Sequence, residues 1–192
     1  MAERYFGAGK GLTDLIYLNG GASGIGCGMI VGGTVVGGVA GYAGEFGHTR
    51  VSGSDRTDSA GITGTLEAEV TRKGLLDALG LASADADELE QALLAADSPV
   101  VRAEVNRQLD YLAVALAGAI NILNPQLVVL CGFLASLLAV DPERLRTAVS
   151  SMALGASFGS VRVSAAQLGS NLLMIGAAER AFERLLDDPS GS

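Results

Sequence analysis

The chain contains a single histidine, His48, and it lies three residues after Glu45. At this spacing the two side chains can reach one small ligand, whether the segment is a turn or the first turn of a helix. A carboxylate accepts two hydrogen bonds and an imidazole donates or accepts one, which suits the vicinal hydroxyls of a sugar. Two charge-assisted hydrogen bonds of about 1.5–3 kcal/mol each approach the roughly 4 kcal/mol that millimolar affinity requires. The alternative is structural: Glu45 caps a helix and His48 is a hydrogen-bonded turn residue.

A glycine-rich turn precedes this pair. Residues 14–19 are rich in β-branched and aromatic side chains, residues 25–31 alternate bulky and small ones, and five small residues separate the two segments. This pattern predicts an antiparallel hairpin. Backbone N–H groups in such a turn can form a concavity that binds phosphate. The turn alone is a weak signal, and taken by itself it favours a plain hairpin over a phosphate loop.

The rest of the chain predicts alternating helices and strands around these segments. Periodic apolar residues and capping signals predict helices, and short β-branched or wholly apolar runs predict strands. The helices are expected over Leu66 to Leu79, Ser83 to Ala96, from Ser98 to Leu123, from Asp141 to about Met152 and over Asn171 to Leu186, after a helix end in Met1 to Gly9. Further strands are expected at Thr34 to Val36, Leu127 to Leu130 and Val161 to Val163, and a polar tail from Asp187.

Composition is typical of one compact α/β domain. The 192 residues are 49% apolar and include 27 glycines, a length within the range of single domains. A net charge of −8 disfavours direct contact with nucleic acid, which requires a basic surface. Cys27 and Cys131 lie far apart and do not form a disulfide framework, so a reducing cytoplasmic setting is expected. No apolar run reaches the roughly 20 residues of a membrane span, and no signal peptide is expected.

The combined glycine and acidic motifs resemble the ROK family (repressor, open reading frame, kinase). The matching segments are Phe6-Gly7-Ala8-Gly9, Ile16-Tyr17-Leu18, Gly24-Ile25-Gly26-x-Gly28, Gly33, Gly41, Gly44-Glu45-Phe46-Gly47-His48, Gly61 to Glu67 and Gly176-Ala177-Ala178. They extend over nearly the whole chain. The resemblance implies an α/β lobe of the actin-like ATPase (ribonuclease-H-like) fold, with a mixed sheet of about five strands flanked by helices.

The resemblance also implies roles for single residues. Glu45 and His48 match the family's sugar-contacting ExGH motif, and Glu67 matches the glutamate that completes the sugar pocket. The family's second nucleotide phosphate loop is matched, as a vestigial loop in this chain, by Gly20, Gly21, Ser23, Gly24 and Gly26. Cys131-Gly132 matches a Gly-Gly turn under the adenosine, and the cysteine side chain there disfavours adenine.

A structural zinc site of the family is altered in this sequence. In the family the histidine binds zinc together with three cysteines, and the matching positions here are Asp58, Ala60 and Thr65. A closed zinc site needs four good ligands, so no zinc is expected. Structural zinc contributes on the order of 10 kcal/mol in small zinc domains. We therefore expect the loop from Ser52 to Gly64 to be mobile or to be held by other contacts.

Three functions are compatible with these features. The family's catalytic aspartate motif, its first phosphate loop and the helix–turn–helix of its repressors have no counterpart in residues 1–192, which we interpret as a single C-terminal lobe. The first hypothesis is the sugar effector-binding part of a ROK transcriptional regulator, inactive as a kinase, which forms a homodimer and reaches DNA only through another domain. The second is the C-terminal half of an ATP-dependent sugar kinase. The third is a remnant that only self-associates. No cofactor is expected; ATP with Mg²⁺, and zinc, enter only through the resemblance.

Overall fold

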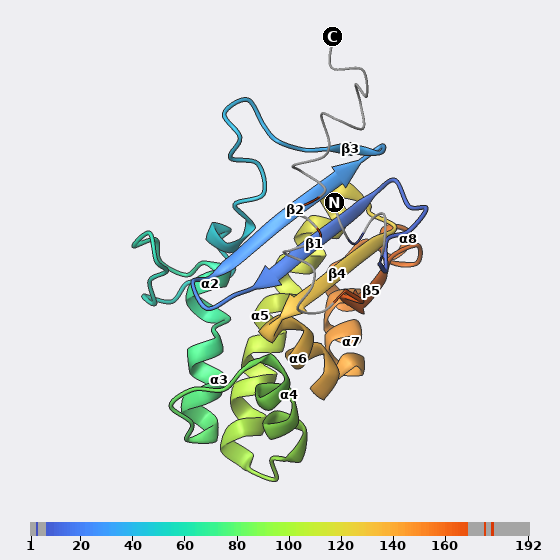
Figure 1. Ribbon diagram of the computed structural model, residues 1–192. Helices are drawn as coiled ribbons and strands as arrows, with labels where there is room; N and C mark the ends of the chain where they lie inside the picture. Colours follow the sequence, from blue (N-terminus) through green and yellow to red (C-terminus); the bar gives the residue numbers. More distant parts are fainter. Residues whose placement is uncertain (1–2, 4–6, 169–174, 176–177, 179–192) are drawn as a thin grey trace.

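The computed structural model describes residues 3, 7–168, 175 and 178, and its centre is a five-stranded mixed sheet (Figure 1). The strand order is β3-β2-β1-β4-β5. Strands β1, β2 and β3 are antiparallel neighbours, whereas β4 is parallel to both β1 and β5. The strands are β1 (Leu15–Gly20), β2 (Ile25–Val31), β3 (Thr34–Val35), β4 (Leu127–Gly132) and β5 (Arg162–Ala165). The α/β class and the mixed sheet are thus confirmed.

The predicted glycine hairpin joins β1 to β2. Its register pairs Leu15 with Ile30 at one end and Gly20 with Ile25 at the other. The turn closes with a hydrogen bond of 2.9 Å from the Gly21 N–H to the Gly24 carbonyl oxygen. Gly24 has φ 140°, a backbone conformation that only glycine adopts at low cost. The turn is therefore a fixed element rather than a loose loop.

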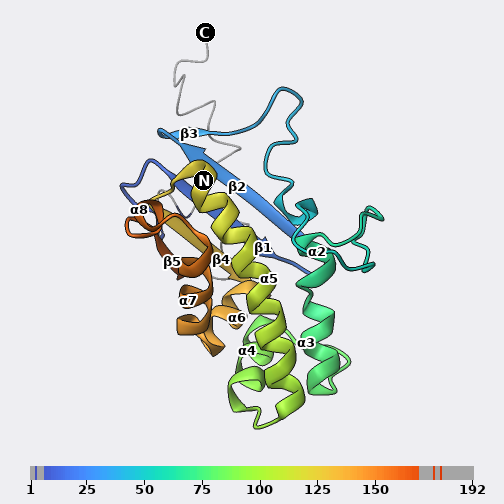
Figure 2. The same ribbon diagram turned by 180° about the vertical axis from the view of Figure 1, so that it is seen from behind.

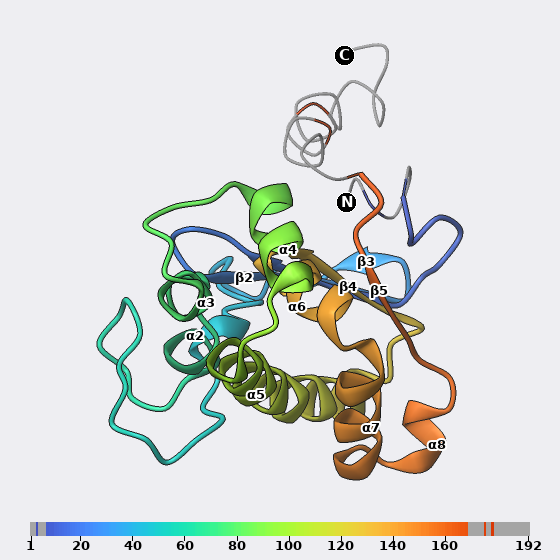
Figure 3. The same ribbon diagram turned by 90° about the horizontal axis from the view of Figure 1, so that it is seen from below.

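The main helices lie on one side of the sheet (Figures 2 and 3). They are α2 (Leu66–Glu69), α3 (Arg72–Leu79), α4 (Ala86–Ala95), α5 (Pro99–Leu123), α6 (Phe133–Val140) and α7 (Pro142–Met152). Two further elements are short: η1 (Phe46–His48) and α8 (Gly155–Phe158). The alternation along β1 directs Ile16 and Leu18 into the same buried cluster as Leu112 and Leu116 of α5. Each fully buried Leu or Ile contributes about 1.5–3 kcal/mol to the stability of the fold. Helix α5, which supplies many of these side chains, is therefore the central helix of the core.

Several predicted boundaries agree with the structure. Helix α4 carries the predicted capping box between Asp85 and Glu88, and α5 and α7 have Pro99 and Pro142 in their first turns. Helices α6 and α8 were not predicted, and β4 runs on to Gly132. The expected helix over 171–186, the tail from Asp187 and most of the helix end before Gly7 lie outside the described residues.

One predicted helix is wrong. Residues 66–79 form two helices, α2 and α3, with a break at Val70 and Thr71. The side-chain amide of Gln108 accepts a hydrogen bond from the Thr71 N–H (3.1 Å) and donates one to the Thr71 carbonyl oxygen (3.0 Å). The Thr71 side chain in turn caps α3 by accepting from the Gly74 N–H. A side chain from α5 therefore replaces the hydrogen bonds of a continuous helix.

Within the described part of the chain, no helix is both long enough and apolar enough to cross a membrane.

Gly132, the last residue of β4, allows a test of the close approach between the ends of β4 and β1. It has φ 61°, and a Cβ atom there would collide with the carbonyl oxygen of Gly20. We expect Gly132→Ala to lower the free energy of unfolding by about 2–4 kcal/mol, measured by urea denaturation. Gly28→Ala is the control, because a Cβ at Gly28 has no neighbour within 4 Å. Equal stability of the two variants would contradict the strained geometry at Gly132.

Candidate functional site

Glu45 and His48 lie at the two ends of the short helix η1. The His48 Nε2 and Glu45 Oε2 atoms are 3.9 Å apart, and the side chains are 30% and 61% exposed. That distance is longer than a hydrogen bond. The Glu45 side chain makes no capping hydrogen bond to η1, so the structural role considered for it is not observed. Both groups can face the same small ligand.

His48 is held from its other ring nitrogen by Asp58. The Nδ1 to Oδ2 distance is 2.8 Å, and the Asp58 side chain is fully buried. The same carboxylate accepts hydrogen bonds from the hydroxyl of Thr65 and from the N–H groups of Ala60 and Ile62, each at 2.9 Å. Burial by itself would raise the pKa of Asp58, but these hydrogen bonds outweigh it and lower the pKa to about 2. Asp58 is therefore ionised at neutral pH, and its hydrogen bond raises the pKa of His48.

These contacts show how the residues at the family's zinc positions are used in this chain. The residues at those positions are His48, Asp58, Ala60 and Thr65, and three of them are joined through the Asp58 carboxylate while Ala60 donates only its backbone N–H. Ala60 has no ligating side chain and no thiolate is present, so the donor set does not fit a closed zinc site. Among the described residues no cluster of three acidic, histidine or cysteine side chains is placed to hold a metal. The Ser52 to Gly64 loop is held by other contacts, one of the two outcomes expected.

Glu67 joins that loop to the glycine hairpin. Its Oε2 accepts from the Ile25 N–H at 3.0 Å, and its Oε1 accepts from the N–H and hydroxyl of Ser59 at 3.2 and 2.5 Å. A Cβ atom built on Gly47 of η1 would be 3.3 Å from Glu67 Oε2, so the carboxylate lies beside η1. Burial would raise the pKa of Glu67, but the hydrogen bonds from Ser59 and Ile25 lower it. Glu67 thus remains an acceptor at neutral pH.

The glycine turn, the loop and Glu67 surround a small pocket of about 210 Å³. It is lined by Gly21, Ala22, Ser23, Gly24, Thr57, Asp58, Ser59, Glu67, Val70, Thr71, Arg72, Lys73 and Phe133. Of the predicted phosphate-loop residues, the turn itself contains Gly21, Ser23 and Gly24. Gly20 ends β1 and Gly26 lies within β2, so these two belong to strands.

The turn predicted for adenosine lies at the same edge of the sheet. Cys131 pairs with Asn19 and Gly132 with Gly20 in the parallel β1/β4 ladder, so both strands end together. Phe133, the first residue of α6, lines the pocket beside the glycine turn. The edge at which parallel strands end is a common ligand site in α/β sheets. The structure therefore brings the two predicted nucleotide elements together, and it places Glu67 next to them.

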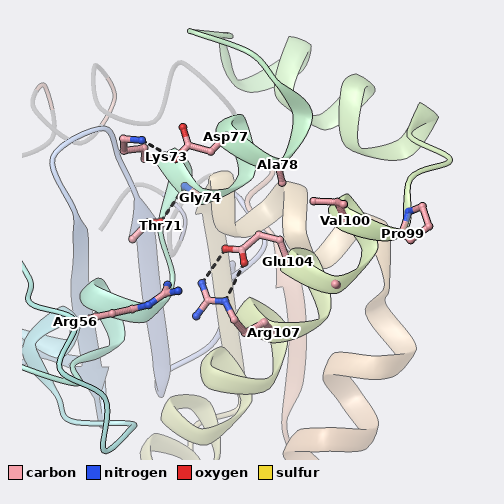
Figure 4. Close-up of a pocket in the computed structure, with 11 residues that line it drawn as sticks. Arg56, Thr71, Lys73, Gly74, Asp77, Ala78, Pro99, Val100, Glu104 and Arg107 are labelled. Atoms are coloured by element: carbon pink, nitrogen blue, oxygen red, sulfur yellow. Dashed lines mark hydrogen bonds and ion pairs between the residues drawn. The ribbon is translucent and has the colours of Figure 1, made fainter.

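A buried ion pair behind this site was not predicted from the sequence. The Glu69 side chain is 2% exposed, and its Oε2 lies 2.9 Å from Arg107 Nη1. Arg107 also donates to both carboxylate oxygens of Glu104, at 2.9 and 2.8 Å (Figure 4). The hydroxyls of Ser52 and Ser54 donate to Glu69 Oε1, which fixes the start of the loop to α2 and α5. The available signal in the sequence was a polar residue, Gln108, on the otherwise apolar inner face of α5.

The chain also resembles known proteins over nearly its whole length. It matches the ROK family over residues 1–183. It is 26% identical over 204 residues to the xylose repressor of Caldicellulosiruptor bescii, an alignment that covers 98% of this chain and 51% of the repressor. The chain thus spans about half the length of that curated relative.

Solved structures of ROK family proteins are also similar to this chain. A ROK family glucokinase from Streptomyces griseus, in complex with glucose and AMPPNP, aligns with TM-score 0.77 and 26% identity over 93% of this chain and 64% of the kinase. A ROK family transcriptional regulator, a homolog of the E. coli MLC protein, shares the fold with TM-score 0.76 and 19% identity over 92% of this chain and 48% of its own. The fold is the α/β lobe of the actin-like ATPases. The chain belongs to the ROK family, and both its regulators and its sugar kinases are similar to it.

The buried ion pair gives a prediction for stability. We expect Arg107→Met to lower the free energy of unfolding by about 3–5 kcal/mol, because it leaves the buried Glu69 carboxylate without its main partner. The measurement is urea denaturation. Lys73→Met is the control, since its pair with Asp77 is largely exposed and exposed pairs contribute about 0–1 kcal/mol. A loss in Arg107→Met no larger than in the control would show that the pair is not needed.

The altered zinc positions give a prediction for metal content. We expect purified protein to contain zinc far below one equivalent, and its unfolding temperature to be unchanged by chelators, because hydrogen bonds to Asp58 take the place of ligand bonds. Elemental mass spectrometry and thermal denaturation with and without a chelator measure this. Stoichiometric zinc, or a chelator-induced fall in unfolding temperature, would contradict it.

Proposed function

We propose that this chain is the effector-binding part of a ROK-family transcriptional regulator, and that its effector is a sugar held by Glu45, His48 and Glu67. The observation that carries the proposal is the placement of these three side chains around η1. The carboxylate of Glu45 has no hydrogen-bond partner among the described residues, and the Nε2 of His48 is directed to the same side. Acceptors grouped in this way suit the hydroxyls of a neutral sugar.

The relatives support the regulator class and suggest the first ligand to test. The xylose repressor of Caldicellulosiruptor bescii covers 98% of this chain, so xylose is the first candidate, with glucose as the second because a glucokinase structure holds it. In this proposal the chain binds sugar without phosphorylating it. Contact with DNA belongs to another domain, in keeping with the net charge of −8. Homodimer formation and a cytoplasmic setting stay predictions.

A kinase origin is the second candidate. The glycine turn and the Gly132 turn lie at one sheet edge beside Glu67, an arrangement that suits a nucleotide next to a sugar. In that case this chain is the C-terminal half of a sugar kinase. Neither candidate expects sugar phosphate from residues 1–192 alone, because the family's catalytic aspartate motif has no counterpart there. Catalytic turnover on incubation with ATP, Mg²⁺ and glucose would therefore overturn the regulator proposal. An adjoining helix–turn–helix in the full-length protein would favour the regulator.

The binding proposal is tested by calorimetric titration with xylose, glucose, mannose and N-acetylglucosamine. We expect one sugar to bind with an affinity in the millimolar range or tighter, and Glu45→Gln to weaken it about tenfold, because one charge-assisted hydrogen bond contributes about 1.5–3 kcal/mol. Asp87→Asn is the matched control, since Asp87 is an exposed carboxylate on α4. Absence of binding to the whole panel at tens of millimolar, or equal affinity of the Glu45→Gln variant, would contradict the proposal.

A further inference from the structure

The Asp58 carboxylate is enclosed by three hydrogen-bond donors and by the Nδ1 atom of His48. Its Oδ1 accepts from the N–H groups of Ala60 and Ile62, both at 2.9 Å. Its Oδ2 accepts from the Thr65 hydroxyl at 2.9 Å and faces His48 Nδ1 at 2.8 Å. An ionised carboxylate offers about four acceptor positions and no proton. All four positions are therefore used, and the side chain is fully buried.

This environment dictates which nitrogen of His48 carries the proton. A carboxylate that can only accept requires N–H on Nδ1, and in the neutral imidazole the proton then leaves Nε2 as an acceptor. Nε2 is the nitrogen on the side of Glu45, 3.9 Å from its Oε2. The other titratable groups that act on the imidazole, Glu45 and Glu67, are carboxylates as well. The site therefore presents acceptors: one imidazole nitrogen and two carboxylates.

We propose that Asp58 is the positioning residue of this site, and that it fixes His48 in the Nδ1–H form so that Nε2 accepts a hydrogen bond from a ligand hydroxyl. Asp58 does this without a metal, in a set of side chains that does not fit zinc. The ligand is then a neutral polyol that must donate at this position. The part of this inference that concerns the ligand rests on the sugar-binding function proposed above, and the part that concerns His48 does not.

The chain offers a direct spectroscopic test, because it contains a single histidine. Long-range ¹H–¹⁵N NMR spectra distinguish the two neutral imidazole forms. At a pH well above the pKa of the imidazole we expect the wild-type chain to show the Nδ1–H form. A wild-type imidazole with its proton on Nε2, or an even mixture of the two forms, would overturn the proposal without any variant being needed.

A substitution tests the cause. In Asp58→Asn the amide oxygen can still accept from the backbone, while the amide NH₂ donates to Nδ1, so the proton of His48 is expected to move to Nε2. Asp55→Asn is the matched control, because Asp55 is an exposed carboxylate in the same loop; its spectrum should equal that of the wild type. An Asp58→Asn chain that is folded but keeps the Nδ1–H form would overturn the role of Asp58.

The effect of Asp58 on ligand affinity is measured with the sugar that binds best in the titrations. We expect Asp58→Asn to weaken binding at least tenfold and Asp55→Asn to leave it unchanged. Among deoxyfluoro analogues of that sugar, which cannot donate at the substituted position, we expect one to lose affinity in the wild type but not further in Asp58→Asn. Equal sugar affinity of wild type and Asp58→Asn would overturn the positioning role, whereas the expected tautomer with no sugar binding at all would overturn only the proposed function.

Discussion

The ion pair between Glu69 and Arg107 is the interaction on which the candidate site depends. A carboxylate that is 2% exposed is costly to bury unless donors surround it. Arg107 supplies one donor to it and binds Glu104 and the Glu69 carbonyl oxygen with the others. Since Ser52 and Ser54 complete the shell, the start of the loop is fixed to the longest helix of the core. Glu67, two residues earlier in α2, is positioned as a consequence.

Three carboxylates share the task of ordering the Ser52 to Gly64 loop. Glu69 holds its start, Asp58 folds its tip back onto His48 and Thr65, and Glu67 binds Ser59. A single hydrogen bond to a charged group contributes about 1.5–3 kcal/mol, which is far less than a structural metal in a small domain. Because several acceptors each form such hydrogen bonds, their combined contribution compensates for the weakness of a single bond. Beyond its start, the loop is therefore held by several bonds rather than by one.

The parts of the fold that the sequence predicted well are governed by neighbours along the chain. Glycines and β-branched residues define the β1–β2 hairpin, and Asp85 with Glu88 defines the start of α4 through a capping box three residues wide. The break between α2 and α3 has a different cause, because Gln108 lies 37 residues after Thr71. Asp58 was predicted only as a residue at a former metal position. The four groups around its carboxylate meet only once the loop has folded, so local spacing carries no sign of them.

The contacts of Glu67 leave room for the ligand role that the proposed function gives it beside its role in the fold. Its Oε1 accepts two hydrogen bonds from Ser59, while Oε2 accepts one from Ile25. A carboxylate has about four acceptor positions, so one position on Oε2 is left for a ligand hydroxyl. That oxygen is also the one nearest to Gly47 of η1, the segment between Glu45 and His48. In the proposed function, a sugar hydroxyl would bind there while Ser59 and Ile25 stay in place. The same bonds keep the carboxylate oriented before the ligand arrives, which lowers the entropic cost of binding.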